Sequence, residues 1–198
     1  MKLTTTQVMD KIVSVDLTQM VVPGKNKGER GQSLELLLGI PNSSALTDLE
    51  DGELKTFTLG ESIAVTQLGH CLDEVINGHI SFEKSKLGQK LRQTIYVVFA
   101  KTGQYKGSRL LTQDTDGLHY QHLEEDFYSI SEAIRTAFEK KRKIGTTNGP
   151  NNLLQIRTKA SKNSKGGYTP LMFNGVELKD KGMAFYLKGE FGKKILHK

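Results

Sequence analysis

The sequence predicts an α/β fold, because segments with helical periodicity alternate along the chain with short runs rich in Val, Ile, Tyr and Phe. Of its 198 residues, 36% are hydrophobic and 25% are charged, as in an ordinary globular protein. The chain has no internal repeat and no long low-complexity tract. No linker-like segment separates independent domains, so we expect a single domain over residues 1–198.

Four segments carry apolar residues at helical spacing and are expected to be helices. The first places Val8 and Ile12 on one side, with Thr6 as its cap, and the second is closed by Gly39. The third ends in the basic run 140–143 followed by Gly145, which suits the negative end of a helix dipole. The four segments are Thr6–Met20, Gly28–Leu38, Leu123–Lys143 and Phe191–Leu196.

Six short runs have the composition of β-strands. Asn174-Gly175 follows the apolar run Leu171–Phe173, and this dipeptide is typical of a tight hairpin turn. The six predicted strands are Glu53–Thr58, Ser62–Leu68, Thr94–Lys101, Leu153–Thr158, Thr169–Phe173 and Met183–Leu187.

Positive charge is concentrated in the second half of the chain. Residues 1–100 hold ten basic and twelve acidic residues, whereas residues 101–198 hold eighteen basic and ten acidic ones. From Lys140 to Lys198 there are fourteen basic and three acidic residues, interspersed with aromatic and small polar side chains. This mixture suits a polyanion such as nucleic acid, whose phosphates attract basic side chains while polar ones reach the bases. A lysine-decorated soluble surface would show the same charge.

Several classes of protein are disfavoured by the composition. No run approaches the roughly 18 apolar residues of a membrane span, and no secretory signal opens the chain, so we expect a cytoplasmic protein without a membrane partner. The only cysteine, Cys71, can form neither an internal disulfide nor a cysteine-based zinc site, and is expected to fill the core. The five histidines lack zinc-ligand spacing and are expected to be surface or structural residues.

Candidate chemistry begins in the segment from Asp48 to Lys55. Alternation along a strand places Glu53 and Lys55 on one face and points Leu54 toward the core. Asp48 can turn back to share a hard cation with Glu53, since Mg²⁺ prefers carboxylate oxygens. Lys55 could then orient a water and offset charge that develops on a phosphate. A solvated charged face would have the same spacing.

The same tripeptide recurs as Glu177-Leu178-Lys179. Only Glu53 has carboxylates shortly upstream, at Asp48, Glu50 and Asp51. A divalent ion needs more than one anionic ligand, so we interpret the second copy as a charged hairpin arm.

Glu35 interrupts a run of leucines in the second predicted helix, where Leu34, Leu37 and Leu38 form the expected buried stripe. A carboxylate among leucines is either desolvated and paired or part of a site, and we favour the site.

These residues also carry a resemblance to a known family. Gly31–Gly39, followed by Asp48 and Glu53-Leu54-Lys55, resembles the active-site region of the MutH mismatch-repair nicking endonuclease and its GATC-cutting restriction-enzyme relatives, in the PD-(D/E)xK superfamily. Three further segments resemble that family in the same order, so that the likeness extends over about residues 28–196. They are Ser85–Leu91, Leu154–Ala160 and Phe185–Lys188.

The resemblance implies a restriction-endonuclease-like mixed β-sheet flanked by helices, with two lobes forming a cleft for double-stranded DNA. It implies Mg²⁺ as cofactor, with Asp48, Glu53 and Glu35 at the metal. The implied catalytic residues are Asp48, Glu53, Lys55, Glu35 and Lys90, and the implied DNA-binding residues are Arg157, Lys159, Tyr186 and Lys188.

The chain departs from the family pattern at two points. The interval from Asp48 to Glu53 is two residues shorter than in the mismatch-repair member, which leaves Asp51 as a rival metal ligand. Thr158 replaces a proline in the DNA-reading segment, and this change could alter which bases are accepted.

We therefore expect a Mg²⁺-dependent, sequence-specific DNA endonuclease that cuts GATC, most simply a type II restriction enzyme acting as a monomer or a homodimer. The alternatives are a mismatch-repair nicking endonuclease, which would need a repair partner protein, and a non-catalytic DNA-binding module. A basic RNA-binding protein would explain the charge but not the clustered carboxylates, which repel phosphates unless a metal lies between them.

Overall fold

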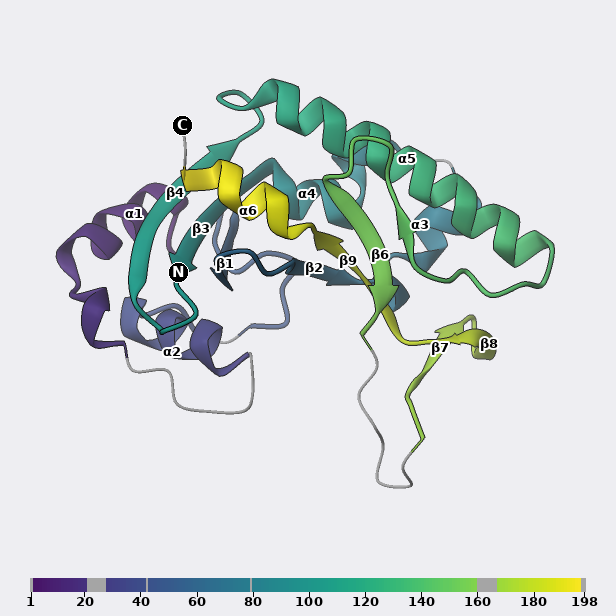
Figure 1. Ribbon diagram of the computed structural model, residues 1–198, viewed down its shortest axis with the longest axis horizontal. Coiled ribbons are helices and arrows are strands. Elements are labelled where there is room, and N and C mark those ends of the chain that lie inside the picture. Colours follow the sequence, from purple (N-terminus) through teal and green to yellow (C-terminus); the bar gives the residue numbers. More distant parts are fainter. Residues whose placement is uncertain (1, 21–27, 42, 79, 160–166, 197–198) are drawn as a thin grey trace. The chain divides into compact units, whose positions relative to one another are not determined.

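The computed structural model describes residues 2–20, 28–41, 43–78, 80–159 and 167–196 (Figure 1). The chain forms two compact units. The first unit comprises residues 1–63, 89–117 and 189–198, and the second comprises residues 64–88 and 118–188. The chain passes between them within β2, within α4 and at the starts of α5 and α6. The single domain expected over residues 1–198 stays a prediction.

A three-stranded mixed sheet forms the centre of the first unit. Its order is β1 (Glu53–Thr58), β3 (Gln93–Phe99) and β4 (Tyr105–Thr112). Strand β1 runs parallel to β3, and β4 runs antiparallel to it. Strand β3 is a nearly continuous apolar run because both of its faces are covered.

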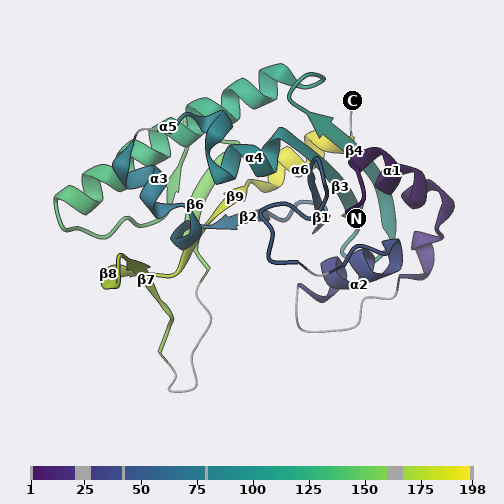
Figure 2. The ribbon, with the colours of Figure 1, turned by 180° about the vertical axis from the view of Figure 1, so that it is seen from behind.

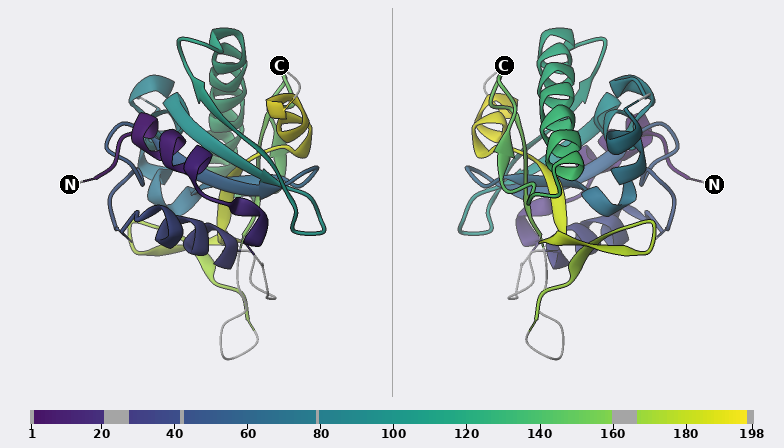
Figure 3. Two further views of the ribbon diagram at one scale, coloured as in Figure 1. Left: turned by 90° about the vertical axis from the view of Figure 1, so that its left-hand side faces the viewer. Right: turned by 90° about the vertical axis from the view of Figure 1, so that its right-hand side faces the viewer.

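Helices cover both faces of this sheet. Helices α1 (Thr5–Ser14) and α2 (Glu29–Leu38) lie on one face of the sheet (Figure 3). Their buried side chains belong to the same core cluster as Leu54, Ile95 and Val97. Helix α6 (Gly189–Leu196) packs on the other face, where the Phe191 ring lies edge-on to Tyr96. The expected α/β class, a mixed sheet flanked by helices, is confirmed.

A four-stranded sheet and one long helix form the second unit. The strand order is β2 (Ile63–Gln67), β9 (Met183–Leu187), β6 (Leu154–Thr158) and β5 (Thr147–Asn148). The long helix α5 (Gly117–Glu139) runs through this unit (Figure 2). Its Phe127 packs against Phe185 of β9, which ties the helix to the sheet.

Short elements complete the chain. Helix α4 leads directly into β3, and the β7–β8 hairpin is a two-stranded sheet of its own. These elements are η1 (Leu17–Gln19), η2 (Leu68–His70), α3 (Leu72–Asn77), η3 (Phe82–Lys84), α4 (Lys86–Arg92), β7 (Pro170–Phe173) and β8 (Val176–Lys181).

Helix boundaries differ from the predictions for local reasons. Helix α1 is capped by Thr4, not Thr6, and ends at Ser14, not Met20, because the Asp16 carboxylate accepts the Thr18 N–H and starts a separate 3₁₀ turn. Helix α5 begins at Gly117 and ends at Glu139. Its end is a Schellman arrangement in which Lys141 adopts φ 48°, so Gly145 is not its cap.

Strands were predicted more closely than helices. Strands β1 and β9 have the expected bounds, and β2, β3, β6 and β7 differ from the predictions by one or two residues at an end. Asn174-Gly175 forms the β7–β8 turn with both residues at positive φ, as the dipeptide predicts. The six predicted strands do not include β4, β5 or β8.

The leucine stripe of α2 is narrower than expected. Leu34 and Leu38 are buried, one turn apart, whereas Leu37 and Leu36 are exposed. The expectation for Leu37 was therefore wrong, because only the i and i+4 positions of this short helix face the sheet.

None of the helices among the described residues combines the length and the apolar composition needed to cross a bilayer. Ala160, the last residue of one segment that resembles the MutH family, lies outside the described residues.

Candidate active site

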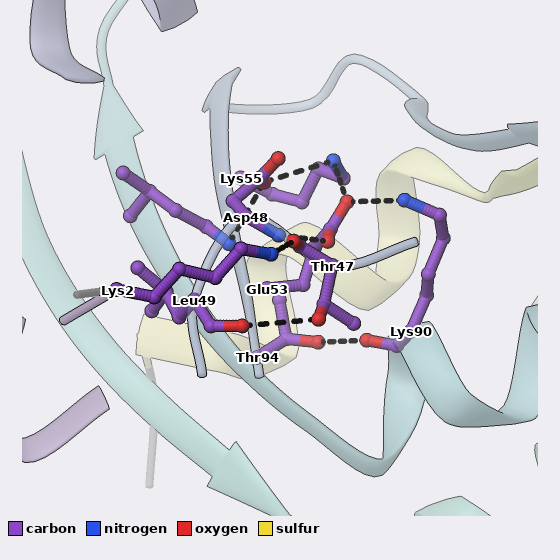
Figure 4. A network of polar contacts seen from close by, with 9 residues as sticks. Lys2, Thr47, Asp48, Leu49, Glu53, Lys55, Lys90 and Thr94 are labelled. Atoms are coloured by element: carbon purple, nitrogen blue, oxygen red, sulfur yellow. Dashed lines mark hydrogen bonds and ion pairs between the residues drawn. The ribbon is translucent and has the colours of Figure 1, made fainter. Parts of the chain in front are cut away.

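Glu53 is a buried carboxylate at the first position of β1, with 1% of its side chain exposed. Its Oε1 accepts hydrogen bonds from the ammonium groups of Lys55 and Lys90, and the Lys90 Nζ lies at 2.8 Å (Figure 4). Its Oε2 accepts the backbone N–H of Asp48 at 3.1 Å. Both oxygens of the buried group are thus satisfied, as a buried charge requires.

Asp48 lies beside this pair. Its Oδ2 accepts the N–H of Leu54 at 3.3 Å and lies 3.8 Å from Lys55 Nζ, so one ammonium group approaches both carboxylates. Burial raises the pKa of Asp48, the charge of Lys55 opposes this shift, and the charge of Glu53 adds to it. The Asp48 side chain is 30% exposed and that of Glu53 only 1%, so Asp48 is the carboxylate that solvent and ligands can reach.

Lys90 reaches Glu53 from the last turn of α4. The Thr94 hydroxyl donates to the backbone carbonyl of Lys90 at 2.8 Å, and Thr94 lies opposite Glu53 in the parallel β1–β3 register. The helix end that carries Lys90 is therefore fixed next to the strand position that carries Glu53.

Glu35, on α2, belongs to the same electrostatic environment. Its pKa is raised, chiefly by burial and then by the charge of Asp48. Lys55 lowers this pKa and Glu53 raises it further. The expectation that the Glu35 carboxylate belongs to the site stays a prediction.

The backbone before Glu53 passes close to other chain segments. A Cβ on Gly52 would lie 2.5 Å from the carbonyl oxygen of Gln93 and 2.7 Å from Cγ2 of Thr5. Only glycine fits there, and the close approach brings the start of β1 against the starts of β3 and α1.

Asp51 is engaged elsewhere. Its Oδ1 accepts the backbone N–H of Thr5 at 2.7 Å, and its Oδ2 accepts the Thr5 hydroxyl at 3.0 Å and Gln93 Nε2 at 2.9 Å. Of the two rival carboxylates, the structure therefore places Asp48 beside Glu53 and turns Asp51 toward the N-terminus of α1.

The donor set of Asp48 and Glu53 fits a hard divalent cation. Both offer carboxylate oxygens, and the shared contact with Lys55 shows that one positive group can reach both. Mg²⁺ is commonly held by one or two carboxylates together with waters and substrate phosphates. Among the described residues, no three His, Cys, Asp or Glu side chains are grouped closely enough to hold a metal together. The role of Glu35 as a further ligand stays a prediction.

The predicted DNA-reading residues lie in the second unit. The Arg157 guanidinium, on β6, stacks over the Tyr186 ring of the adjacent β9 at 4.2 Å from its centroid. The Tyr186 residue is 9% exposed, so Arg157 is the more accessible member of this pair. Lys159 directly follows β6, and its backbone N–H donates to Gly182 O at 2.8 Å. Lys188 directly follows β9, and its ammonium group donates to Asn152 Oδ1.

The second Glu-x-Lys copy lies on β8, in the hairpin. Glu177 is exposed, and Lys179 Nζ donates to the backbone carbonyl of Lys141 at 2.8 Å. This placement agrees with the interpretation of a charged hairpin arm.

Asp126, on α5, is a fully buried carboxylate that the sequence analysis missed. It accepts three backbone N–H groups, from Asn151 at 2.6 Å, Leu153 at 2.9 Å and Leu154 at 2.8 Å. The signal was an acidic residue on the apolar stripe of α5, next to Phe127. Because both oxygens of this carboxylate accept hydrogen bonds from the backbone, we infer that Asp126 holds the loop before β6 in place.

Comparisons with known proteins find likenesses among solved structures. No protein-family model matches the chain, and no curated protein matches it. A solved structure described as a restriction endonuclease MvaI–cognate DNA substrate complex is similar with a TM-score of 0.44 and 12% sequence identity, over 96% of this chain and 93% of that one.

Proposed function

We propose that the protein is a Mg²⁺-dependent endonuclease that hydrolyses phosphodiester bonds of double-stranded DNA at a short specific sequence, as a type II restriction enzyme does. The observation that carries the proposal is the buried Glu53 carboxylate, paired with Lys55 and Lys90 and adjacent to the more accessible Asp48. The resemblance of the same residues to the MutH family favours GATC as the site.

The charge of the site explains why a divalent cation is needed. Asp48 and Glu53 are balanced by Lys55 and Lys90, and Glu35 adds a further negative charge nearby. A phosphodiester brings one more negative charge and would be repelled. Bound between Asp48 and Glu53, Mg²⁺ would polarise the scissile phosphate and lower the pKa of a bound water.

The two lysines are suited to different tasks. The Lys55 side chain is 22% exposed and also lies near Asp48, so its ammonium group can turn from Glu53 to a phosphate oxygen or an attacking water. Lys90 is 16% exposed and contacts the same Glu53 oxygen. When Lys55 turns to the substrate, Lys90 keeps the buried carboxylate paired, which avoids the cost of an uncompensated buried charge.

The second unit supports base recognition. Arginine and lysine side chains favour the O6 and N7 acceptors of guanine in the major groove. The Tyr186 ring holds the Arg157 guanidinium in one plane by a cation–π contact, which reduces the side-chain entropy lost on binding. We infer that Arg157 and Lys159 read the guanine of the site.

The test is digestion of plasmid DNA, unmethylated or adenine-methylated at GATC, with Mg²⁺ or with a chelator, followed by sequencing of the ends. Double-strand cuts at GATC that need Mg²⁺ are expected. Nicks alone would favour the mismatch-repair alternative, and binding to GATC duplexes without cleavage would reduce the protein to a DNA-binding module.

A matched pair of variants tests the catalytic assignment. Glu53→Ala and Lys55→Ala should each abolish Mg²⁺-dependent cleavage, because the carboxylate pair or the transition-state ammonium is lost. Glu177→Ala and Lys179→Ala remove the same residue types from the β8 arm and should retain most activity. Equal loss from both pairs would contradict the assignment.

A further inference from the structure

The N-terminal arm, residues 2–5, contacts the carboxylate loop, residues 47–52, at three places. Lys2 Nζ donates to the carbonyl of Thr47 at 2.5 Å, as Figure 4 shows. The N–H of Glu50 donates to the carbonyl of Leu3 at 2.9 Å. The Asp51 carboxylate binds the backbone and hydroxyl of Thr5. The loop that carries Asp48 is thus held along its length by the beginning of the chain.

Asp51 makes more hydrogen bonds than the other loop residues in these contacts. Thr5 is the first residue of α1, and its N–H has no partner within the helix, so a carboxylate at this point satisfies it and complements the helix dipole. Gln93 Nε2, from the first residue of β3, donates to both Asp51 and Thr5. The three side chains join the loop to a helix and to the central strand.

The loop transmits this constraint to the carboxylates. The Leu49 N–H donates to Gly52 O at 2.9 Å, and the Leu49 side chain is fully buried in the core beneath α1 and α2. The turn therefore has one end at Asp48 and the other at Glu53. Releasing Asp51 would free the segment whose conformation sets the separation of the two carboxylates.

We propose that Asp51, Thr5 and Gln93 form a positioning cluster that fixes Asp48 relative to Glu53, so that the pair binds a divalent cation more tightly when α1 is docked on the loop. This inference rests on the proposed function, in which Asp48 and Glu53 hold Mg²⁺. In this proposal the cluster itself contacts neither the metal nor the substrate and acts only through the loop.

The expected effect is a weaker metal site in a folded protein. Residues that orient metal ligands from behind typically change metal affinity by about 10- to 100-fold when they are substituted. Because this cluster acts through the loop, we expect the lower end, about tenfold. A residue that merely caps α1 would lower the melting temperature and leave the affinity for metal unchanged.

The experiment measures Mn²⁺ binding by calorimetry on the DNA-free, full-length protein, together with the melting temperature by circular dichroism. Thr5→Val removes the hydroxyl without a change of charge and should weaken Mn²⁺ binding about tenfold. Thr5→Ser keeps the hydroxyl and should restore near-native binding. Asp51→Ala should match Thr5→Val or exceed it.

Glu50→Ala is the control, since it removes an exposed carboxylate from the same loop and should leave Mn²⁺ binding unchanged. Native Mn²⁺ affinity in Thr5→Val and Asp51→Ala, with only a lower melting temperature, would overturn the positioning role. So would an equal loss in Glu50→Ala, which would indicate a general charge effect.

The same measurements separate this inference from the proposed function. If the native protein binds Mn²⁺ and cuts DNA while the variants bind Mn²⁺ equally well, only the positioning role fails. If the native protein binds no divalent cation, the metal site and the positioning role both fail. If Asp51→Ala does not fold, the Thr5→Val and Thr5→Ser pair decides the outcome.

Discussion

Burial of the Glu53 carboxylate costs free energy, and the residues that offset this cost also belong to the candidate active site. A carboxylate with almost no solvent contact would be strongly destabilised if it were alone, and two ammonium groups at one of its oxygens compensate for burial. In the proposed function, the same arrangement leaves one ammonium group available for a substrate. Asp48, which shares Lys55 but remains accessible, would then supply the oxygen that an incoming cation meets first.

Cys71 gives a prediction at the same scale. It is 1% exposed, and burial, followed by the charge of Glu74, raises its pKa to about 12. A raised thiol pKa keeps the group protonated, and the thiolate is the reactive form. We expect almost no reaction of the native protein with a disulfide reagent at pH 8, and reaction of one thiol after denaturation in urea, both followed by absorbance. Rapid reaction of the native protein would contradict the core assignment.

Elements are joined in the second unit by Asp126, which connects α5 to the loop that precedes β6. Gly149 is required opposite it, because a Cβ there would lie 2.1 Å from the Asp126 carboxyl carbon. The loop ends where β6 begins, so the carboxylate also sets the position of the strand that carries Arg157.

Asp126→Ala should therefore destabilise the second unit. Three backbone N–H groups would lose a charged acceptor in a buried place, and we expect the free energy of unfolding to fall by about 3 kcal/mol or more. Urea unfolding followed by circular dichroism measures this change. Glu124→Ala, which removes a half-buried carboxylate from the same helix, should have a small effect. A similar loss from both would argue against a special role for Asp126.

Base recognition is a prediction about β6 and the residue that follows it. Arg157→Ala and Lys159→Ala should each sharply reduce cleavage at the cognate site, because each lost base contact removes about 1 to 3 kcal/mol of discrimination. Weak binding to random duplex should change little. Cleavage of a randomised duplex library, read by sequencing, tests both, with Lys179→Ala as the basic control. Native site preference at full rate in the two variants would show that they are ordinary surface charges.

The whole molecule has an uneven distribution of charge that matters for its binding partner. The fourteen basic and three acidic residues from Lys140 to the C-terminus lie mostly in the second unit, which also contains the predicted reading residues. The carboxylates of the candidate active site lie in the first unit. The proposed function thus places phosphate attraction and hydrolysis in different parts of the chain.

Salt dependence follows from this distribution. If residues 140–198 supply most phosphate contacts, the logarithm of the binding constant should fall linearly with the logarithm of salt concentration, by about 0.9 per neutralised phosphate on duplex DNA. Fluorescence anisotropy with a labelled duplex over a series of salt concentrations measures the slope. A nearly flat dependence would point to a partner other than DNA.

Local sequence patterns were sufficient to predict several features of the structure correctly. Alternation in Glu53-Leu54-Lys55 placed β1 and its faces correctly, and Leu54 does point into the core. Asn174-Gly175 located the hairpin because its conformational preference is a property of the dipeptide. The contrast between the two Glu-x-Lys copies was also visible, since it depends only on which carboxylates are near in sequence.

What the sequence by itself determined was therefore short in range: the α/β class, most strands and the acidic segment that carries Asp48. Tertiary structure alone decided that Lys90, 37 residues from Glu53, binds its carboxylate, and that Asp51 turns to Thr5, 46 residues away. It also decided that Asp126 is buried and Leu37 is not. Periodicity and turn preferences act within a few residues, whereas these contacts depend on how helices pack on each sheet, and packing can bring any two distant segments together.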